Sequence, residues 1–499
     1  MKTMEALQKL DKETDANVYL VGGFVRDFLR NKRNGDLDIV IRNLDISKVL
    51  EFLKKHGKIE AIDLSTANGK FNVSILLFKA SGDNTEAQIT LARRGKKQIP
   101  NLNNTLTQDS KFRDFKLNAM YLPINFKSRK DVIDKHGGIE DIKNRRISAV
   151  GSAVERLTEQ PIRIMRAISL AARLGYQIDK QLEEAVRECV KKLKTIPVEN
   201  IRDEFNKIIM SKKPSKYLRL MAKLGVLKVI LPELHKCIGV KQDRRFHKYD
   251  VFTHAIYTCD NMEENLNLRL AALFHDIGKP DTMKIVKEDR GKRRITFHKH
   301  DALGTKIGKA LLLRLKYDNK TVEEVSTLIN LHMYHYTSDV YRCSKCKWST
   351  VATNKLVVCP QCSSDLKLQV GWSDVAVRRF ISKVGITKEN LLSLEDLSLF
   401  KLRAAERLGN GFKTIAVTDR QKDFQARIID VYRRSHGLTI DDLDIDGNVI
   451  MEIYNLEESP KVGSILTFLL EKVLEHPPLN NRLDLLKLTT EYLYKNHFI

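Results

Sequence analysis

The chain has 499 residues, 42% of them apolar, and its Lys and Arg residues outnumber Asp and Glu by 24. This length predicts three or four domains with buried cores, and the charge favours a nucleic acid or an anionic membrane surface as partner, with a solvated basic enzyme surface as the alternative. No apolar run approaches the roughly 20 residues that span a bilayer and the N-terminus has no signal-peptide core, so we exclude a membrane protein and expect a cytoplasmic one.

The first part of the chain, residues 1 to about 145, alternates short apolar runs such as "VYLVGG", "LDIVIR", "NVSILLF" and "AQITLA" with turns and helical stretches. This pattern predicts a small mixed α/β domain. From about residue 150 onward, apolar residues recur at intervals of three and four, which predicts helices. A short insert with four cysteines interrupts this helical part.

The segment "VGGFVRDFLRNKRNGDLDIVI", residues 21–41, combines a Gly-Gly pair with an Asp-x-Asp pair. Side chains two apart on a strand point the same way, so Asp36 and Asp38 place two carboxylates on one face. Such carboxylates resist joint ionisation unless a cation lies between them, and Mg²⁺ prefers oxygen ligands. Gly22 and Gly23 let backbone N–H groups approach a phosphate, and Arg26 adds positive charge. The segment therefore predicts a site for Mg²⁺ and a triphosphate.

Together with this segment, four later ones resemble the class II CCA-adding enzymes and bacterial poly(A) polymerases of the nucleotidyltransferase superfamily. They are "RDFKLNAM", "DVIDKHGGIEDIKNRRISAVG", "EQPIRIMRAISLAARLGY" and "PVENIRDEFNKII". The resemblance covers nearly the whole chain apart from the cysteine insert. It implies an α+β protein in which Asp36 and Asp38 are catalytic and bind Mg²⁺. It also implies that Arg113, Asp114 and Asn118 bind the nucleotide, and that Asp114 and Asn118 position its sugar and triphosphate.

The same resemblance implies four consecutive parts. They are a nucleotidyltransferase (polymerase beta-like) head with a mixed sheet at 1–145, a helical neck with the nucleotide-selecting motif at 146–215, an HD-domain body at 216–415 and a helical, tRNA-binding tail at 416–499. In the tail, Asp446, Gly447 and Gly463 match the family's turn positions.

The family selects its nucleotide with an E-D-x-x-R helix, which "EQPIRIMRAISLAARLGY" resembles. The resemblance assigns Glu159, Arg163 and Arg166 to nucleotide binding, but the family's aspartate is Gln160 here. C and A both present an amine donor beside a ring-nitrogen acceptor, so Arg163 can donate and the Gln160 carbonyl can accept. An amide can also flip and donate, which would admit U or G. Base selection is therefore less firmly predicted than nucleotidyl transfer.

Two further positions depart from the family. The first arginine of its R-R-D element is Phe112 here. For the third carboxylate that is common on a later strand, "TEAQIT" offers Glu86, with Gln88 on the same face.

A second site is predicted from "FTHAI", "AALFHDIGKP" and "HKHDALG", which resemble the HD phosphohydrolase superfamily. The predicted ligands of a divalent metal are His254, His275, Asp276 and Glu406, with Asp374 as the fallback for the last position. His300 and His332 are expected to help bind phosphate or a second ion. Such a site would hydrolyse phosphoesters, and the resemblance suggests 2′,3′-cyclic phosphates or damaged 3′ ends.

The cysteine insert, residues 341–366, contains two C-x-x-C pairs separated by twelve residues. This spacing predicts a structural zinc ribbon in which Cys343, Cys346, Cys359 and Cys362 bind Zn²⁺. Because the protein fills all four positions, we expect this zinc to stabilise rather than to catalyse.

These features together predict a template-independent nucleotidyltransferase that completes the 3′-CCA end of tRNA from CTP and ATP, with a possible phosphohydrolase in the HD domain. One alternative is an enzyme that adds only A, only C or poly(A). A second is a phosphohydrolase whose head only grips RNA, and a third is a zinc-bearing RNA-binding scaffold.

Overall fold

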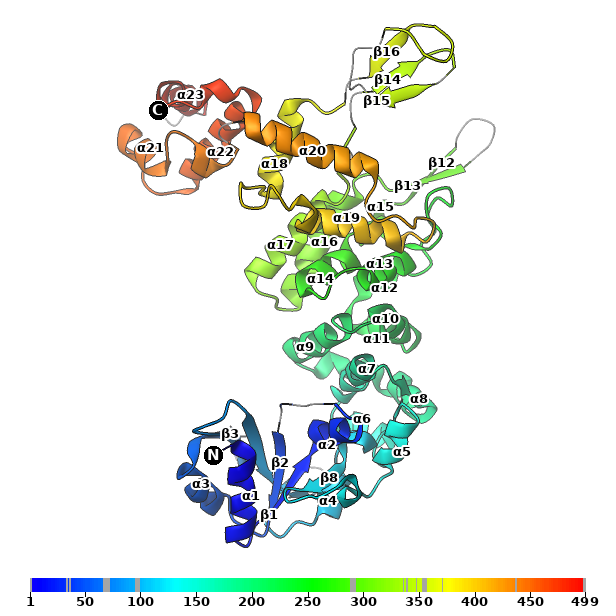
Figure 1. Ribbon diagram of the computed structural model, residues 1–499, viewed down its shortest axis with the longest axis vertical. Coiled ribbons are helices and arrows are strands. Elements are labelled where there is room, and N and C mark those ends of the chain that lie inside the picture. Colours follow the sequence, from blue (N-terminus) through cyan, green and yellow to red (C-terminus); the bar gives the residue numbers. More distant parts are fainter. Residues whose placement is uncertain are drawn as a thin grey trace. The chain divides into compact units, whose positions relative to one another are not determined.

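The computed structural model describes the chain except at residues 1, 33–34, 36, 66–71, 95–98, 288–292, 335, 338–339, 347, 352–356, 370, 436–437 and 497–499 (Figure 1). The chain divides into two units. The first contains residues 1–240, 251–270 and 307–323, and the second contains residues 241–250, 271–306 and 324–499. The four-part division expected from the sequence stays a prediction, and the α+β class is confirmed.

The first unit begins with a seven-stranded sheet in the order β3-β4-β5-β2-β1-β8-β9. The strands are β1 (Asn17–Val21), β2 (Leu37–Arg42), β3 (Gly57–Ser65), β4 (Asn72–Ala80), β5 (Glu86–Leu91), β8 (Met120–Pro123) and β9 (Ile133–Asp134). Strands β2 and β5 pair in parallel, and the other neighbours are antiparallel. The predicted mixed sheet is therefore present.

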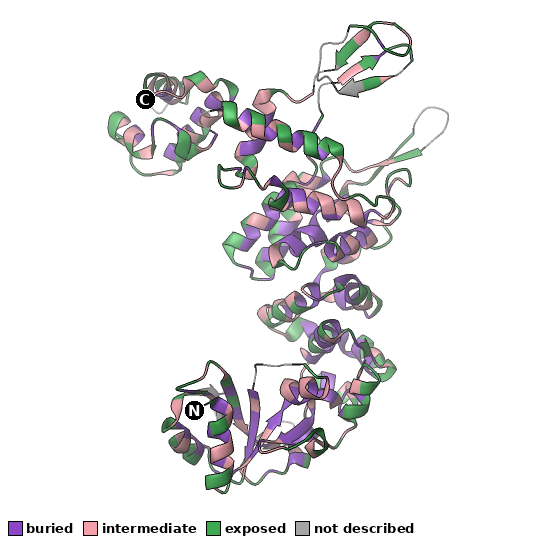
Figure 2. Cartoon of the chain, viewed as in Figure 1, coloured by how far each residue is buried: buried purple, intermediate pink, exposed green. Residues whose placement is uncertain are grey.

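Helices α1 (Thr3–Glu13) and α3 (Ile46–Lys54) share a buried core with one face of this sheet (Figure 2). Along β5, burial alternates, so Ala87 and Ile89 enter the core while Glu86 and Gln88 face the other side. Asp38 is the direct partner of Gln88 in the register of β2 and β5, so the two side chains share that other face. The alternation of burial along β5 thus places Glu86, Gln88 and Asp38 on the face of the sheet that lies away from this core.

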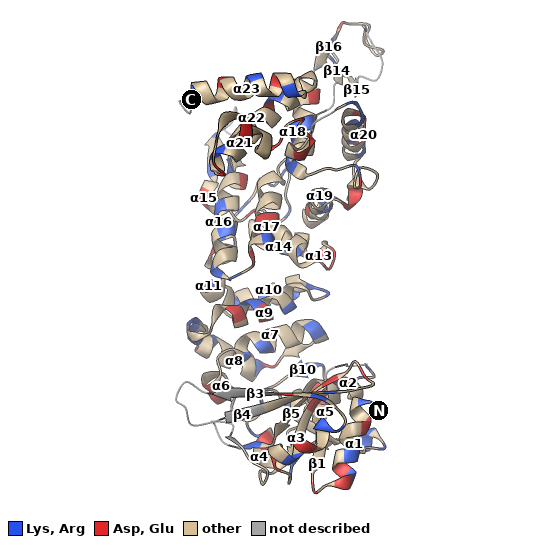
Figure 3. Cartoon of the chain, turned by 90° about the vertical axis from the view of Figure 1, so that its left-hand side faces the viewer, with Lys and Arg blue, Asp and Glu red and all other residues tan. Residues whose placement is uncertain are grey.

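Helices follow the sheet within the first unit. They are α6 (Ala153–Glu159), α7 (Arg163–Leu174), α8 (Lys180–Cys189), α9 (Val198–Ile209), α10 (Pro214–Lys223), α11 (Val226–Ile230), α12 (Pro232–Lys236) and α13 (Val251–Asp260). Helix α7 ends where Gly175 takes a left-handed conformation with φ of 74°. Lys and Arg residues occur along α7, α9 and α10 (Figure 3).

Three helices run across the division of the chain: α14 (Leu266–Phe274), α16 (His300–Arg314) and α17 (Asn319–Leu331). The second unit also contains α15 (Lys279–Thr282), the hairpin β12 (Lys284–Lys287) and β13 (Arg293–Thr296), α18 (Asp374–Val384), α19 (Ser398–Gly409), α20 (Asp419–Arg434), α21 (Gly447–Tyr454), α22 (Pro460–Glu475) and α23 (Arg482–Lys495). Within the described residues, none of the helices has the length and apolarity needed to cross a bilayer.

The cysteine insert forms a three-stranded antiparallel sheet in the order β15-β14-β16. Its strands are β14 (Val340–Cys343), β15 (Ser349–Val351) and β16 (Leu366–Gln369). The small sheet interrupts the helices of the second unit, as the sequence predicts.

Candidate functional sites

The turn between β1 and α2 (Gly22–Leu29) lies directly against Asp38. Gly22 has φ of +64°, and a Cβ atom added to it would lie 2.9 Å from Oδ2 of Asp38. Only glycine fits both the left-handed backbone and this close approach. Helix α2 starts at Gly22 without a side-chain cap, so its first N–H groups are suited to an anion. The turn therefore brings a phosphate-binding feature and a carboxylate together.

The carboxylate of Asp38 opens onto a cavity of about 380 Å³ that Glu86 and Gln88 also line. These oxygen-bearing side chains provide the donor chemistry that Mg²⁺ prefers. Asp36, the other predicted catalytic carboxylate, lies outside the described residues. Glu86 lines the same cavity as Asp38, and it is the candidate third carboxylate from the sequence.

Arg26 links α2 to the segment that contains Asn118. Its Nη1 donates to Oδ1 of Asn118 at 3.0 Å, and its Nε donates to Oδ1 of Asp27 at 3.1 Å. Burial alone would raise the pKa of Asp27, but hydrogen bonds and charge from Arg26 and Arg30 lower it. Arg26 is therefore a fixed, charged guanidinium one helical turn after Gly22.

Asp114 and Arg166, two of the predicted nucleotide-binding residues, contact each other. Oδ2 of Asp114 lies 2.7 Å from Nη2 of Arg166, and Oδ1 accepts from the backbone N–H of Phe115 at 2.8 Å. Asp114 is buried, whereas the Arg166 side chain is 46% exposed, so the far side of its guanidinium remains open to a ligand. The pair joins the sheet region to helix α7.

Arg113 has a different environment from the one expected for a nucleotide ligand. Its Nε donates to Oδ2 of Asp109 at 2.9 Å and to the hydroxyl of Tyr121 at 3.1 Å. The Tyr121 hydroxyl in turn donates to Asp109 at 2.6 Å. Burial opposes ionisation of Asp109, but the charges of Arg113 and Arg93 lower its pKa. These contacts give Arg113 a structural role, while its assignment to nucleotide binding stays a prediction.

The corner between α6 and α7 contains the predicted nucleotide-selecting residues. Arg163 is 3% exposed and donates to the carbonyls of Arg156 at 3.0 Å and Phe112 at 2.9 Å. Glu159 lies 3.5 Å from Arg163 and 3.0 Å from Arg156. The backbone carbonyl of Gln160 accepts from the Arg163 N–H at 2.9 Å. The structure thus brings the three predicted residues together at one corner, where Glu159 contacts the buried guanidinium of Arg163 and Gln160 bonds its backbone.

Two features of this corner were missed by the sequence reasoning. Arg156 lies over the Phe112 ring at 5.2 Å, and its guanidinium also contacts Glu159. Phe112, which stands where the family has an arginine, therefore contacts two arginines. Its ring packs against Arg156, and its carbonyl accepts a hydrogen bond from Arg163. Among the described residues, the buried Nε of Arg163 has no hydrogen-bond partner.

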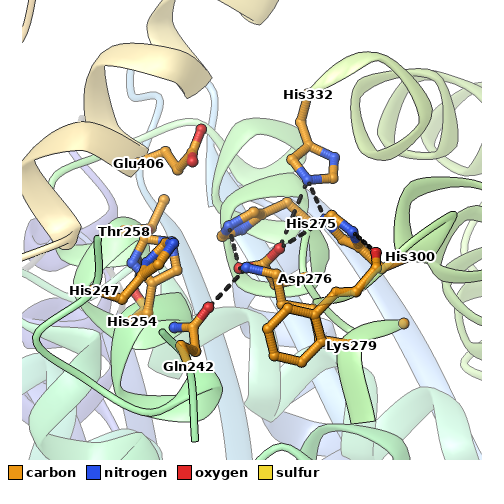
Figure 4. A network of polar contacts seen from close by, with 12 residues as sticks. Gln242, His247, His254, Thr258, His275, Asp276, Lys279, His300, His332 and Glu406 are labelled. Carbon is orange, nitrogen blue, oxygen red and sulfur yellow. Dashed lines mark hydrogen bonds and ion pairs between the residues drawn. The ribbon is translucent and has the colours of Figure 1, made fainter. Parts of the chain in front are cut away.

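In the second unit, three histidines surround the carboxylate of Asp276 (Figure 4). Nε2 of His275 lies 3.2 Å from Oδ2 of Asp276, and Nε2 of His300 lies 3.3 Å from Oδ1. Nε2 of His332 lies 3.7 Å from Oδ1 and 3.3 Å from Nε2 of His300. All four side chains are at most 7% exposed.

The backbone determines which ring nitrogen of each histidine faces Asp276. Nδ1 of His275, His300 and His332 donates to the carbonyl three residues earlier, at 2.8, 2.7 and 2.6 Å. A neutral ring then presents the Nε2 lone pair to the carboxylate, and two acceptors at these distances repel unless a cation lies between them. Burial opposes protonation of His275, yet the charge of Asp276 raises its pKa, whereas burial lowers the pKa of His332. The donor set therefore fits a divalent metal.

Lys279 and Gln242 complete this cluster and were not selected from the sequence. Nζ of Lys279 lies 2.7 Å from Oδ2 of Asp276 and 2.8 Å from Oε1 of Gln242. The segment "HDIGKP" contains Lys279 three residues after Asp276, so one helical turn could have indicated it. His254 is buried on α13, in the first unit, and its role as a ligand stays a prediction.

The two candidates for the last ligand lie in different surroundings. Glu406 accepts from Nη1 of Arg403 at 2.8 Å, and its negative charge favours protonation of His275. Asp374, at the start of α18, pairs instead with Arg427 and with Arg434 of α20, the latter at 3.2 Å. The geometry therefore favours Glu406 over the fallback.

The four predicted zinc ligands converge in the insert. Their Sγ atoms all lie within 4.8 Å of one another, with 3.4 Å between Cys343 and Cys362 and 3.5 Å between Cys346 and Cys359. Tetrahedral Zn²⁺ with Zn–S bonds of about 2.3 Å would place its sulfurs ~3.8 Å apart. The cysteines are free thiols rather than disulfides, so the arrangement fits a bound metal.

Three family models match the chain: the poly A polymerase head domain over residues 18–148, the probable RNA and SrmB-binding site of polymerase A over 175–238, and the HD domain over 247–357. The A-adding tRNA nucleotidyltransferase of Deinococcus radiodurans is 30% identical over 330 residues, which cover 64% of this chain and 69% of the relative. The CC-adding tRNA nucleotidyltransferase of Thermus thermophilus is 28% identical over 330 residues, with the same coverage.

The multifunctional CCA protein of Xanthomonas campestris is 28% identical over 334 residues, which cover 63% of this chain and 75% of the relative. Among solved structures, the Bacillus stearothermophilus CCA-adding enzyme in complex with CTP aligns with a TM-score of 0.61 at 19% identity. That alignment covers 100% of this chain and 98% of the other, so the fold is shared over the whole length.

Proposed function

Because the chain belongs to the family of class II tRNA nucleotidyltransferases and bacterial poly(A) polymerases, we propose that it completes the 3′-CCA end of tRNA from CTP and ATP, without a nucleic-acid template. The observation that supports this most strongly is the fit of Gly22 against the carboxylate of Asp38 beside the cavity of β5. Cytoplasmic localisation belongs to the same proposal, since it follows from the tRNA substrate.

The proposed reaction joins the 3′ oxygen of the RNA to the α-phosphorus of the nucleotide. The bond between that phosphorus and its bridging oxygen breaks, and pyrophosphate leaves. The helix start at Gly22 and Gly23, together with Arg26, would bind the triphosphate. Asp38 and Asp36 would hold Mg²⁺, which favours the ionised hydroxyl and reduces the charge of the triphosphate.

Base selection would use the corner between α6 and α7. Arg163 would donate to the ring nitrogen of C or A, and the side-chain carbonyl of Gln160 would accept from the exocyclic amine. Glu159 holds the guanidinium of Arg163 in place. The exposed side of Arg166 would meet the incoming phosphate or sugar.

The test uses purified protein and a tRNA that lacks its last three nucleotides. With CTP and ATP together, sequencing of the 3′ ends should find CCA, and with CTP alone only C. Asp38→Asn should lower the rate at least about a hundredfold, because a carboxylate that holds the metal is lost. Asp15→Asn, an equal change at an exposed site of the same unit, should leave the rate unchanged. If the protein added only A, only C or poly(A), the proposed function would be that narrower activity instead of CCA addition.

We also propose a phosphoesterase activity for the histidine cluster around Asp276, with 2′,3′-cyclic phosphates and damaged 3′ ends as substrates. It is supported by three Nε2 atoms that face one carboxylate and by Lys279, which can neutralise a phosphate. Hydrolysis of 2′,3′-cyclic AMP with Mn²⁺, Ni²⁺, Co²⁺ or Mg²⁺ tests it. Asp276→Asn should abolish hydrolysis, and a rate equal to that of the unchanged protein would contradict the proposal.

The two sites are separable by experiment. If Asp38→Asn retained every activity of the protein, a phosphohydrolase with an RNA-binding head would be the better description. If neither nucleotide addition nor hydrolysis occurred, the chain would be an RNA-binding scaffold. For the cysteine cluster, we propose that the bound metal is a structural Zn²⁺.

A further inference from the structure

The second unit contains a cavity of about 410 Å³ that neither proposed activity uses. It lies among α19, the start of α20 and the segment after α17. The lining residues that matter here are Tyr334, Tyr336, Phe424, Arg403, Arg407 and Arg420. Its volume is within the range of sites that bind small ligands.

One wall of the cavity is a packed group of aromatic rings. Tyr336 stacks on Phe424 with 4.2 Å between the ring centroids and an interplanar angle of 19°. Tyr334 lies tilted against Phe424 at 5.9 Å and edge-on to Phe400 at 5.8 Å. Phe400 and Phe424 are fully buried and hold the two tyrosines in place, whereas Tyr334 is only partly buried and can present its ring to a flat ligand.

Three arginines line the same cavity. The guanidinium of Arg403 lies 5.7 Å from the centre of the Tyr334 ring, and Nε of Arg407 donates to the carbonyl of Ile415 at 3.2 Å. Arg420 is exposed in the first turn of α20, where the helix dipole disfavours a cation. Three arginines thus converge on one cavity, one of them at an electrostatically unfavourable position.

Nearby acidic groups compensate this charge only in part. Glu406 pairs with Arg403 at 2.8 Å, and Asp419, which also lines the cavity, has a fully exposed side chain. Lys413 adds a further cation close by: burial lowers its pKa, and the charge of Arg407 lowers it further. An anionic ligand would relieve this concentration of positive charge.

We propose that this cavity binds a nucleoside phosphate, either free or at the end of an RNA strand. The aromatic wall provides a surface for the base, and Arg407 and Arg420 bind the phosphate. The inference goes beyond the proposed function, because none of these residues belongs to the nucleotide-adding site or to the cluster around Asp276. Arg403 pairs with Glu406, the candidate last ligand of that cluster.

The test locates bound nucleotide by photocrosslinking of the full chain with 8-azidoadenosine 5′-monophosphate. Peptide mass spectrometry should find adducts in residues 334–336 or 418–424, separate from any adduct in residues 1–175. In the double variant Arg407→Gln, Arg420→Gln, the affinity measured from these adducts should fall by about tenfold or more, because two charged partners of the phosphate are lost.

The matched control is Lys422→Gln, Arg433→Gln, which removes two exposed charges from α20 outside the cavity and should leave the adducts unchanged. If the double variant proved unstable, Arg420→Gln alone would serve, since that side chain is on the surface. Competition by AMP and by a short RNA with a 3′-phosphate shows whether the free nucleotide or the RNA end binds more tightly. The proposal is overturned if adducts form only in residues 1–175, or if both variants lose them equally.

Discussion

Substitution of Gly22 by alanine tests the geometry on which nucleotide addition depends. The change adds a Cβ atom 2.9 Å from Oδ2 of Asp38, about 0.5 Å closer than the 3.4 Å at which ordinary contacts begin. It also places alanine at φ of +64°, a conformation that L-residues rarely adopt. We therefore expect the carboxylate of Asp38 to move, because the glycine backbone is fixed by the end of β1 and the start of α2.

The magnitude has two contributions. The left-handed backbone costs about 1–2 kcal/mol for a residue with a Cβ atom. A displacement of about 0.5 Å at a metal-binding carboxylate should lower kcat by roughly tenfold or more, given that ~1 Å of misplacement can cost about a hundredfold. The loss of activity should thus exceed what the loss of stability alone produces.

The assay measures single-nucleotide incorporation into a tRNA without its CCA end, alongside thermal unfolding. Gly175→Ala is the control, since Gly175 has φ of +74° and open space around its Cβ position. Both variants should lose similar stability, but only Gly22→Ala should lose kcat. If Gly22→Ala kept the kcat of the unchanged protein, Asp38 would not depend on this contact and the reasoning would be wrong.

Three further substitutions test other parts of the structure. Gln160→Asp replaces an amide, which can both donate and accept, by a carboxylate that can only accept. Incorporation of U or G relative to C and A should therefore fall by about tenfold. The kcat/KM for each nucleotide measures this ratio, and an unchanged ratio would contradict the role of Gln160. Cys346→Ser should remove the bound zinc, measured by elemental analysis, and leave nucleotide addition intact; full zinc content would refute the four-cysteine site. Asp109→Asn should cost about 3–5 kcal/mol of stability by leaving Arg113 buried without its carboxylate. Folding lowers the pKa of Asp109 below its usual 3.8, so the ionised carboxylate stabilises the folded protein above pH 3.8 and this stabilisation is lost as the pH falls below 3.8. Melting curves from pH 7 to pH 3 should show this loss for the unchanged protein and not for the variant.

Several residues could be assigned from the sequence because their chemistry depends on neighbours in the chain. The Gly-Gly start of α2, the strand that contains Asp38 and the two C-x-x-C pairs are each defined within a few residues. The family resemblance grouped Glu159, Gln160 and Arg163 on one helix, but in the structure α6 ends at Glu159 and α7 begins at Arg163, so the three meet at a corner between two helices.

Other residues acquired their surroundings from contacts distant in sequence. Arg113 matched a nucleotide-binding motif, yet Asp109 and Tyr121 hold it in a buried network. Arg156 gave no signal, because its partner Phe112 lies 44 positions earlier and meets it only after folding. The choice between Glu406 and Asp374 was likewise open until α20 provided arginines for Asp374.

The sequence by itself determined which chemical groups are present and how they are spaced along single helices, strands and turns. Periodicity and backbone preference act over a few residues, so these features can be identified without a fold. Only the tertiary structure decided that Gly22 touches Asp38 and that three histidines point Nε2 at Asp276. The physical reason is that burial and the pairing of distant segments depend on the whole core, which no local pattern contains.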